Sequence, residues 1–191
     1  MTHDPAELPD QLPVPVDDGA ADHLVGTGVP SIVLPSTGGG GVDLSGQSRR
    51  QRIVVFAYPR TGRPGVEPPA GWDEIPGARG CTPEACAFRD LAAEFAAVNT
   101  VIYGLSTQDT DYQSEAVTRL GLPYDLLSDA DLALTEALRL PTFVVDGTTL
   151  LCRLTLVVDQ GMVRHALYPV FPPDQAAADV LAVLRNGSLT A

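Results

Sequence analysis

The sequence Gly80-Cys-Thr-Pro-Glu-Ala-Cys-Ala-Phe-Arg-Asp90 places two cysteines five positions apart at the predicted start of a helix. Thr82 is a favourable N-cap residue, and Pro83 suits the first helical position. Alanine, leucine and phenylalanine continue the helical pattern as far as Ala96. Free N–H groups and the positive end of the helix dipole favour a thiolate there, the reactive form of cysteine. Position alone leaves two interpretations open, a reactive cysteine pair or two small buried thiols.

The spacing of Cys81 and Cys86 restricts the chemistry of the pair. Two Cα atoms five positions apart on an α-helix lie roughly 8–9 Å apart, given a rise of ~1.5 Å and a rotation of ~100° per residue. A disulfide requires about 4.4–6.8 Å between its Cα atoms, so the bond can form only if the first turn of the helix unwinds. As zinc ligands the two thiols are poorly spaced, and Cys152 and His165 would have to complete the set. A switchable disulfide uses this geometry best.

The composition argues against several kinds of partner. The 191 residues carry a formal charge of -12, which disfavours nucleic acid or an anionic membrane surface as a steady partner. No apolar run approaches ~20 residues, so no transmembrane helix is predicted. The N-terminus lacks a positive flank followed by an apolar segment, so we expect no secretory signal and a cytoplasmic location. In a reducing compartment, close cysteines are more often catalytic, redox-active or metal-binding than structural.

One domain preceded by an extension is predicted. Residues 1–28 are acidic and proline-rich and contain no basic residue. Such a segment either wraps the domain or stays mobile. The domain is predicted over residues 29–187, and it begins with a β-hairpin of Pro30–Pro35 and Gly41–Leu44 around a glycine-rich tip.

Strand and helix patterns alternate through the rest of the chain. Arg52–Tyr58 has the continuous apolar character of a central buried strand. Further elements are predicted as a strand at Thr100–Leu105, a helix at Tyr112–Leu120, a short strand at Tyr124–Leu127, a helix at Leu132–Leu138, strands at Pro141–Gly147 and Leu150–Cys152, a hairpin of Arg153–Asp159 and Met162–Val170 with a two-residue turn, and a closing helix at Pro173–Leu184. This order predicts an α/β fold with a mixed central sheet flanked by helices.

A long irregular loop, Pro59–Pro76, joins the first central strand to the cysteine helix. Loops longer than ~12–15 residues in compact domains tend to be functional or disordered. Trp72 and Ile75 are predicted to attach this loop to the body of the domain. Arg60, Arg63 and Arg79 flank it, and they either stabilise an anion at the cysteine or are ordinary solvated charges; for Arg63 we favour the second interpretation.

Several segments resemble a known family. They are Phe56-Ala-Tyr-Pro59, the cysteine segment Gly80–Asp90, Gly121-Leu-Pro-Tyr-Asp-Leu-Leu-Ser-Asp129 and Arg153-Leu-Thr-Leu-Val-Val-Asp159. Together they resemble the peroxiredoxins of the alkyl hydroperoxide reductase/thiol-specific antioxidant type, and most closely the bacterioferritin-comigratory, Q-type branch. The resemblance covers roughly Pro30 to Leu184 and implies a thioredoxin-like fold.

Carried over residue by residue, the resemblance implies roles for five side chains. Cys81 would be the peroxidatic cysteine, Cys86 the resolving cysteine and Arg153 the active-site arginine. The family pattern also has a proline and, three positions before the cysteine, a hydroxyl residue that bonds the peroxide. Here that position is Ala78, so the long loop splits the motif. We therefore expect Pro59 and Thr61 to lie near the active site, with Thr61 as the hydroxyl partner.

A second resemblance competes with the first. Leu140-Pro-Thr-Phe-Val-Val-Asp-Gly147 is similar to the proline-led strand of thioredoxins, and the alternative is that Pro141 simply starts an ordinary strand. Thioredoxins use Cys-x-x-Cys, which is absent here, so the cysteine spacing favours the peroxiredoxin interpretation. Cys152 precedes Arg153, and neighbouring strand residues point to opposite faces, so Cys152 is predicted to be a buried, inert thiol.

The predicted function is reduction of hydrogen peroxide or alkyl hydroperoxides through a Cys81–Cys86 disulfide. The resemblance implies a thioredoxin-type or other dithiol reductant and no metal or cofactor, and we expect a monomer or homodimer. The alternative is a thioredoxin-like redox sensor or thiol–disulfide exchange protein that uses the same bond without peroxidase turnover.

Overall fold

The computed structural model describes residues 8–9 and 11–187. Its strands are β1 (Val33–Pro35), β2 (Gly41–Asp43), β3 (Arg52–Ala57), β4 (Thr100–Ser106), β5 (Asp125–Ser128), β6 (Thr142–Val145), β7 (Thr148–Leu151), β8 (Leu154–Asp159) and β9 (Met162–Leu167). Its α-helices are α1 (Leu44–Ser48), α2 (Cys81–Asp90), α3 (Ala92–Ala97), α4 (Thr110–Leu120), α5 (Ala133–Leu138) and α6 (Ala176–Asn186). Two short 3₁₀ helices are η1 (Trp72–Glu74) and η2 (Pro173–Gln175).

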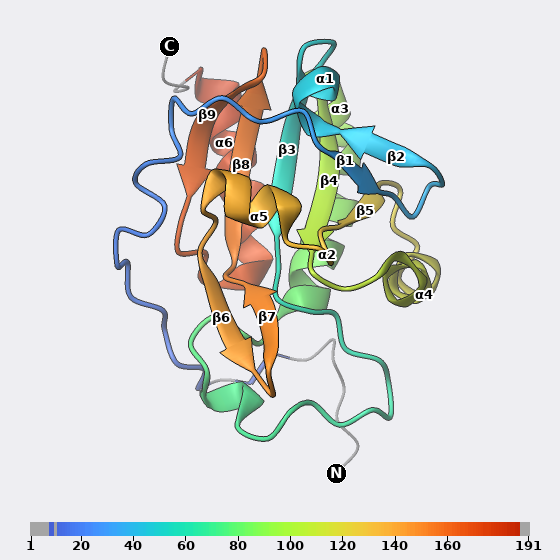
Figure 1. The fold of residues 1–191 in the computed structure, drawn as a ribbon, viewed down its shortest axis with the longest axis vertical. Coiled ribbons are helices and arrows are strands. Elements are labelled where there is room, and N and C mark those ends of the chain that lie inside the picture. Colours follow the sequence, from blue (N-terminus) through green and yellow to red (C-terminus); the bar gives the residue numbers. More distant parts are fainter. Residues whose placement is uncertain (1–7, 10, 188–191) are drawn as a thin grey trace.

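A five-stranded sheet in the order β5-β4-β3-β8-β9 forms the centre of the molecule (Figure 1). β3 pairs in parallel with β4 and antiparallel with β8, while β4 and β5 are parallel and β8 and β9 antiparallel. The mixed central sheet predicted from the sequence is therefore confirmed. The predicted strands Arg52–Tyr58 and Thr100–Leu105 correspond to β3 and β4, and each predicted end lies within one residue of the observed end.

The two faces of the sheet carry separate hydrophobic cores because side chains alternate along each strand. In β3, Ile53 and Val55 belong to the core that includes α5, whereas Val54 and Phe56 belong to the core under α2, α3 and α6. Figure 1 shows α5 in front of the sheet, with α2 and α6 behind it. Phe56 stacks on Phe88 of α2 with ring centroids 4.4 Å apart, so β3 directly supports the cysteine helix.

The predicted hairpins are also present. β1 and β2 form a small antiparallel pair, and β8 and β9 turn through Gln160 and Gly161. These two turn residues have φ of +53° and +76°, as a two-residue hairpin turn that matches the strand twist requires. β6 and β7 form a third, separate sheet at the end of the molecule where the long loop lies (Figure 1).

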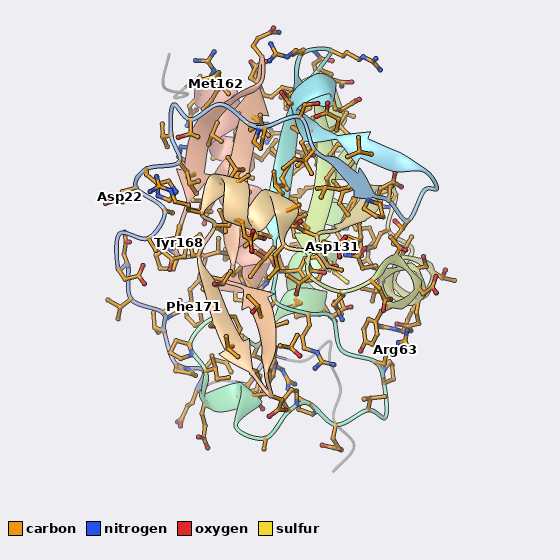
Figure 2. All side chains as sticks on the ribbon, in the orientation of Figure 1. Asp22, Arg63, Asp131, Met162, Tyr168 and Phe171 are labelled. Atoms are coloured by element: carbon orange, nitrogen blue, oxygen red, sulfur yellow. The ribbon has the colours of Figure 1, made fainter. Side chains whose placement is uncertain are left out.

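The described part of the N-terminal segment wraps the domain. Leu24 is fully buried, and the backbone N–H of Gly26 donates to the carbonyl of Val163 at 2.8 Å. The Tyr168 hydroxyl donates to Asp18 at 3.0 Å, and Figure 2 shows Tyr168 beside this segment. Of the two expectations for the acidic extension, wrapping is the one observed, although residues 1–7 and 10 lie outside the described residues.

Two helix boundaries differ from the prediction. The helical pattern after the cysteines is interrupted at Leu91, which ends α2 and precedes α3. The closing helix begins with the 3₁₀ turn η2 before α6 continues as an α-helix. None of the helices in the described range is both long and apolar enough to cross a bilayer.

Candidate active site

Cys81 is the first residue of α2, and Gly80 is its N-cap. Gly80 has φ of +105°, and a side chain there would collide with Pro173 of η2. The prediction of Thr82 as the cap is therefore wrong: Thr82 lies inside the first turn and is 2% exposed. Because η2 packs closely against the start of the helix, only glycine fits one residue before the cysteine. The contact between Gly80 and Pro173 joins residues more than ninety positions apart.

Arg153 contacts the Cys81 sulfur. Its Nη2 donates to Cys81 Sγ at 3.2 Å and to the carbonyl of Arg79 at 3.1 Å. Cys81 is 5% exposed and Arg153 is 3% exposed, so the contact lies in a low-dielectric environment. A guanidinium next to the sulfur can stabilise negative charge that develops there during a reaction, and the charge of arginine does not depend on pH in the physiological range.

Glu84, one turn after Cys81, accepts a hydrogen bond from Arg153 Nη1 and forms an ion pair with it. Glu84 is fully buried. Burial raises the pKa of Glu84 to about 7, and the Arg153 charge acts in the opposite direction. For Arg153, burial works against the charge, but the Glu84 carboxylate and the Cys81 sulfur outweigh it and raise the pKa of the guanidinium. The three groups form one buried charged cluster.

Cys86 lies on the same helix as Cys81, and both are free thiols. α2 is helical from Cys81 through Asp90, so the two sulfurs are held apart in this conformation. The C-terminal part of α2 is anchored, because the Arg89 guanidinium donates to the carbonyl of Leu120 at 2.8 Å. The Tyr124 hydroxyl also donates to the carbonyl of Ala85 at 2.6 Å. Any unwinding that joins the sulfurs must therefore start in the first turn.

A small chamber of about 30 Å³ lies over Cys81. This volume holds one or two water molecules. The long loop supplies much of its wall, and Tyr112 of α4 closes one side. Trp72 is 5% exposed and packs with Ala78 and Leu150, so the prediction that Trp72 attaches the loop to the body is confirmed.

The three loop arginines have different surroundings. Arg79 pairs with Asp73 at 3.1 Å. Arg63 lies over the Tyr112 ring, 3.9 Å from its centroid, and pairs with Glu115 at 3.8 Å. Arg63 is 38% exposed, so its charge is partly solvated as expected, but the side chain also contacts Tyr112 and Glu115. Arg60 lies over the Trp72 ring at 5.9 Å.

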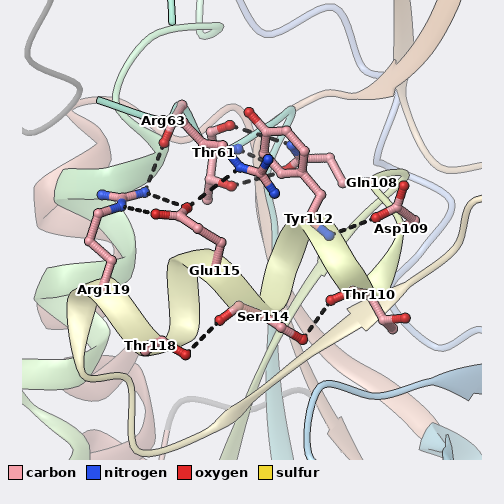
Figure 3. A network of polar contacts seen from close by, with 11 residues as sticks. Thr61, Arg63, Gln108, Asp109, Thr110, Tyr112, Ser114, Glu115, Thr118 and Arg119 are labelled. Atoms are coloured by element: carbon pink, nitrogen blue, oxygen red, sulfur yellow. Dashed lines mark hydrogen bonds and ion pairs between the residues drawn. The ribbon is translucent and has the colours of Figure 1, made fainter. Parts of the chain in front are cut away.

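Thr61 is not placed beside Cys81. Its hydroxyl lies 3.2 Å from Gln108 Oε1, and its backbone N–H donates to the same oxygen at 2.8 Å (Figure 3). Thr61 does not line the Cys81 chamber, so the expectation of a Thr61 hydroxyl directed at the sulfur is wrong for this conformation. Pro59 is buried immediately after β3. Gln108, which lies between β4 and α4, thus accepts from both donors of Thr61.

Cys152 faces a different cavity from the Cys81 chamber. It lines a space with Val14, Val16 and Tyr168, beneath the N-terminal segment. Burial raises the pKa of Cys152 to about 11, which keeps this thiol protonated at neutral pH. The side chain is half-buried rather than fully buried. In the described part of the chain, no cluster of three or more His, Cys, Asp and Glu side chains could hold a metal ion.

Comparison with known proteins identifies the family. The redoxin family model matches residues 24–184, which include every residue of the charged cluster. The chain belongs to the redoxin family. Within this redoxin chain, the match starts at Leu24, the residue of the N-terminal segment that is buried most deeply.

The relatives of this redoxin chain are peroxiredoxins. Peroxiredoxin Q, chloroplastic, of Oryza sativa subsp. japonica is 29% identical over 162 residues, which cover 84% of this chain and 66% of the relative. A Mycobacterium tuberculosis (strain CDC 1551 / Oshkosh) protein named as a peroxiredoxin is 31% identical over 134 residues, covering 70% of this chain and 77% of that protein. The chain thus spans about two thirds of the length of the rice relative.

Solved structures share the fold. The crystal structure of peroxidoxin BcpB from Mycobacterium tuberculosis superposes with a TM-score of 0.70 at 30% identity, covering 85% of this chain and 97% of that one. Peroxiredoxin Q of Xanthomonas campestris gives a TM-score of 0.63 at 23% identity, covering 92% of this chain and 97% of that one. The thioredoxin-like fold and the resemblance to Q-type peroxiredoxins are confirmed, and the competing thioredoxin interpretation is not supported.

Sequence reasoning missed two features of the site. The local sequence pattern gives Glu84 no role, and its buried pairing with Arg153 joins residues 69 positions apart. Tyr112 was part of a predicted helix, with no sign that its ring closes the Cys81 chamber. The one available signal for Glu84 was its spacing, because residues three apart lie on the same side of a helix.

Proposed function

We propose that this chain is a thiol peroxidase in which Cys81 is the peroxidatic residue, Cys86 the resolving residue and Arg153 the residue that stabilises charge at the sulfur. The observation that carries the proposal is the 3.2 Å contact between Arg153 Nη2 and Cys81 Sγ at the start of α2, beneath a chamber that admits a molecule the size of peroxide.

The first step is attack of the Cys81 thiolate on the peroxide. The sulfur–oxygen bond forms as the oxygen–oxygen bond breaks, giving a sulfenic acid and an alkoxide or hydroxide that takes up a proton to leave as alcohol or water. Sulfur is oxidised and peroxide oxygen is reduced. Negative charge moves from sulfur to the departing oxygen, and a fixed guanidinium stabilises that charge without reorganisation.

The second step is formation of the Cys81–Cys86 disulfide. The Cys86 thiol attacks the sulfenic sulfur and water leaves, after the first turn of α2 has unwound. A thioredoxin-type or other dithiol then reduces the disulfide by thiol–disulfide exchange, regenerates both thiols and becomes oxidised itself. The proposal includes a cytoplasmic location, where such reductants occur, and a monomeric or homodimeric state. It also keeps residues 29–187 as the peroxidase domain behind an extension of residues 1–28.

For Pro59 and Thr61 we propose structural roles in the loop and no direct contact with the peroxide. Pro59 is buried near the end of β3 but does not line the Cys81 chamber, so we propose that it fixes the path of the loop as it leaves the strand. Thr61 is proposed to hold the loop through Gln108 rather than to bond the peroxide in this conformation.

A coupled assay tests the function. Purified protein is mixed with hydrogen peroxide, a thioredoxin, thioredoxin reductase and NADPH, and NADPH consumption is followed. We expect turnover by the wild type and by Cys152→Ser, and none by Cys81→Ser. In non-reducing mass spectrometry, peroxide-treated wild type should lose two hydrogens through an internal bridge, and Cys86→Ser should retain one added oxygen. Stoichiometric oxidation without turnover under any dithiol would instead indicate a redox sensor.

A further inference from the structure

Arg60 lies where the Cys81 chamber meets a larger groove. The chamber measures about 30 Å³. The neighbouring groove measures about 280 Å³. Arg60, Pro69 and Tyr112 line both spaces. A molecule whose reactive end reaches Cys81 and whose body lies in the groove therefore passes the Arg60 side chain.

The charge of Arg60 has no counter-ion within the described residues. The other two loop arginines pair with Asp73 and Glu115, but none of the ion pairs among the described residues includes Arg60. Its guanidinium lies over the buried Trp72 ring, and the side chain is half-buried. A partly desolvated cation without a carboxylate partner is a place where an anionic ligand gains a charge-assisted hydrogen bond.

The backbone around Arg60 is held in place from α4. Gly62 accepts a hydrogen bond from Arg119 Nη2 at 2.8 Å, and Glu115 fixes the Arg119 guanidinium at 2.7 Å (Figure 3). Gln108 fixes Thr61, the next residue in the chain. The loop therefore positions Arg60 before any ligand arrives, which reduces the ordering entropy lost on binding.

The surroundings of Arg60 suit a carbon chain attached to an anion. Pro69 and Tyr112 present apolar surface to both the chamber and the groove, and Trp72 adds apolar surface in the chamber. Three carboxylates also line these spaces, Glu67 in the chamber and Asp109 and Asp146 in the groove, but all three residues are exposed. Solvent and salt screen exposed charges strongly, and they screen the half-buried Arg60 less.

We propose that Arg60 binds the carboxylate of an organic hydroperoxide while the hydroperoxide group of the same molecule reaches Cys81. This inference rests on the proposed peroxidase function and specifies its substrate class. The carboxylate is unchanged in the reaction: the oxygen–oxygen bond breaks as described above, and the product is the hydroxy acid. Since the protein carries a net charge of -12, the selectivity comes from the local contact and not from long-range attraction of anions.

The test compares a hydroperoxyhexanoate with its methyl ester, which lacks the negative charge and carries one additional methyl group. The second-order rate constant for Cys81 oxidation is measured for each by stopped flow, and the ratio of acid to ester is the readout. We expect the wild type to prefer the acid by about 10-fold or more, the range expected of a charge-assisted hydrogen bond. Arg60→Gln should bring the ratio close to one, and Arg60→Lys should restore part of the preference. Arg50→Gln, which removes an exposed arginine of the opposite end of β3, should leave the ratio as in the wild type.

The outcomes separate this inference from the proposed function. Equal rates for acid and ester in a wild type that reacts with hydrogen peroxide would overturn the Arg60 inference alone. A preference for the acid that persists in Arg60→Gln would also overturn it. A wild type that reacts with neither hydrogen peroxide nor the two organic probes would overturn the proposed function. A second readout does not depend on peroxide chemistry: hydroxyhexanoate should slow iodoacetamide alkylation of Cys81 in the wild type but not in Arg60→Gln, and equal protection would count against the inference.

Discussion

Arg153 connects the two charged groups of the site, since the same guanidinium donates to Cys81 and pairs with Glu84. Replacing Arg153 by Met should slow oxidation of Cys81 by hydrogen peroxide by about 10²–10³-fold, the loss seen when one fixed donor to a developing negative charge is removed. The rate is measured by stopped flow under single-turnover conditions.

A folding defect must be separated from a chemical one in this experiment. Arg153→Met leaves Glu84 buried without its cation, which destabilises the protein as well. The double variant Arg153→Met/Glu84→Gln removes both charges and should recover stability but not the oxidation rate. Recovery of the rate in the double variant, or a single-variant rate near that of the wild type, would show that Arg153 does not stabilise charge at Cys81.

Glu84 should make stability depend on pH in an unusual direction. Its pKa rises from 4.5 in the unfolded chain to about 7 in the fold because the side chain is buried. Between these values the folded state binds more protons than the unfolded state, so this residue's contribution to stability falls as pH rises. The contribution is complete below about pH 4.5 and is lost as pH passes through about 7.

Urea unfolding of wild type and Glu84→Gln at pH 5 and pH 8 measures this effect. The free energy of unfolding of the variant, relative to the wild type, should increase by roughly 3 kcal/mol or less between the two pH values. Glu136→Gln, a change at an exposed position of α5, is the control and should give a difference that is the same at both pH values. A pH-independent difference for Glu84→Gln would contradict the assignment.

The residues that take part in the chemistry could be predicted from the sequence. The placement of side chains by contacts between distant parts of the chain could not. Cys81 and Arg153 follow from residue type and segment resemblance, and their contact is present at 3.2 Å. Thr61 carries the expected hydroxyl, but Gln108, 47 positions away, determines where that hydroxyl points. Nothing in the local sequence around Thr61 indicates the position of Gln108.

At the scale of the element, some features of α2 could be predicted from the sequence and others could not. Its existence followed from the alanine-rich pattern after the cysteines, although the helix ends before Leu91 and does not continue to Ala96. Its start did not, because a good capping residue at Thr82 competes with a tertiary constraint at Gly80, where only the absence of a side chain allows η2 to pack. The cap is determined by Pro173, and local propensity is overridden.

Gly80→Ala should destabilise the start of α2 and so promote its unwinding. The residue combines a φ of +105° with a side-chain collision against Pro173, which together should lower the free energy of unfolding by about 1–3 kcal/mol. In the proposed cycle, disulfide formation should become faster and peroxide attack slower, because the folded first turn is needed only for the attack. Quenched-flow mass spectrometry of the sulfenic acid and the disulfide measures both steps.

Gly121→Ala is the matched control for this substitution. Gly121 also has positive φ, +62°, but a side chain there meets nothing within 4 Å. It should therefore show the backbone strain without the collision and leave both chemical steps as in the wild type. Equal destabilisation by the two substitutions, with equal rates of disulfide formation, would show that the contact with Pro173 does not control the opening of α2.

At the scale of the whole molecule, the site is assembled from segments that lie far apart in the sequence. β3 supports α2 from below through Phe56, β8 follows Arg153, and the long loop and α4 close the chamber. The strands, the hairpin turns and the mixed character of the sheet were predictable because periodicity and turn residues are local signals. The closure of the chamber by Tyr112 and the position of the N-terminal segment depend on packing between distant parts, and they were not.

The N-terminal segment provides the last test, because it determines whether residues before the predicted domain belong to its core. Leu24 is fully buried in the core that contains α5, whereas Val16 of the same segment is 83% exposed. Leu24→Ala should lower the free energy of unfolding by about 2–5 kcal/mol, and Val16→Ala should change it by less than about 0.5 kcal/mol. Urea unfolding followed by circular dichroism measures both. If the segment were only a detachable cover, Leu24→Ala would increase proteolysis of the N-terminal segment while leaving the global transition unchanged. A single shifted transition would instead mean that the segment folds together with the site it encloses.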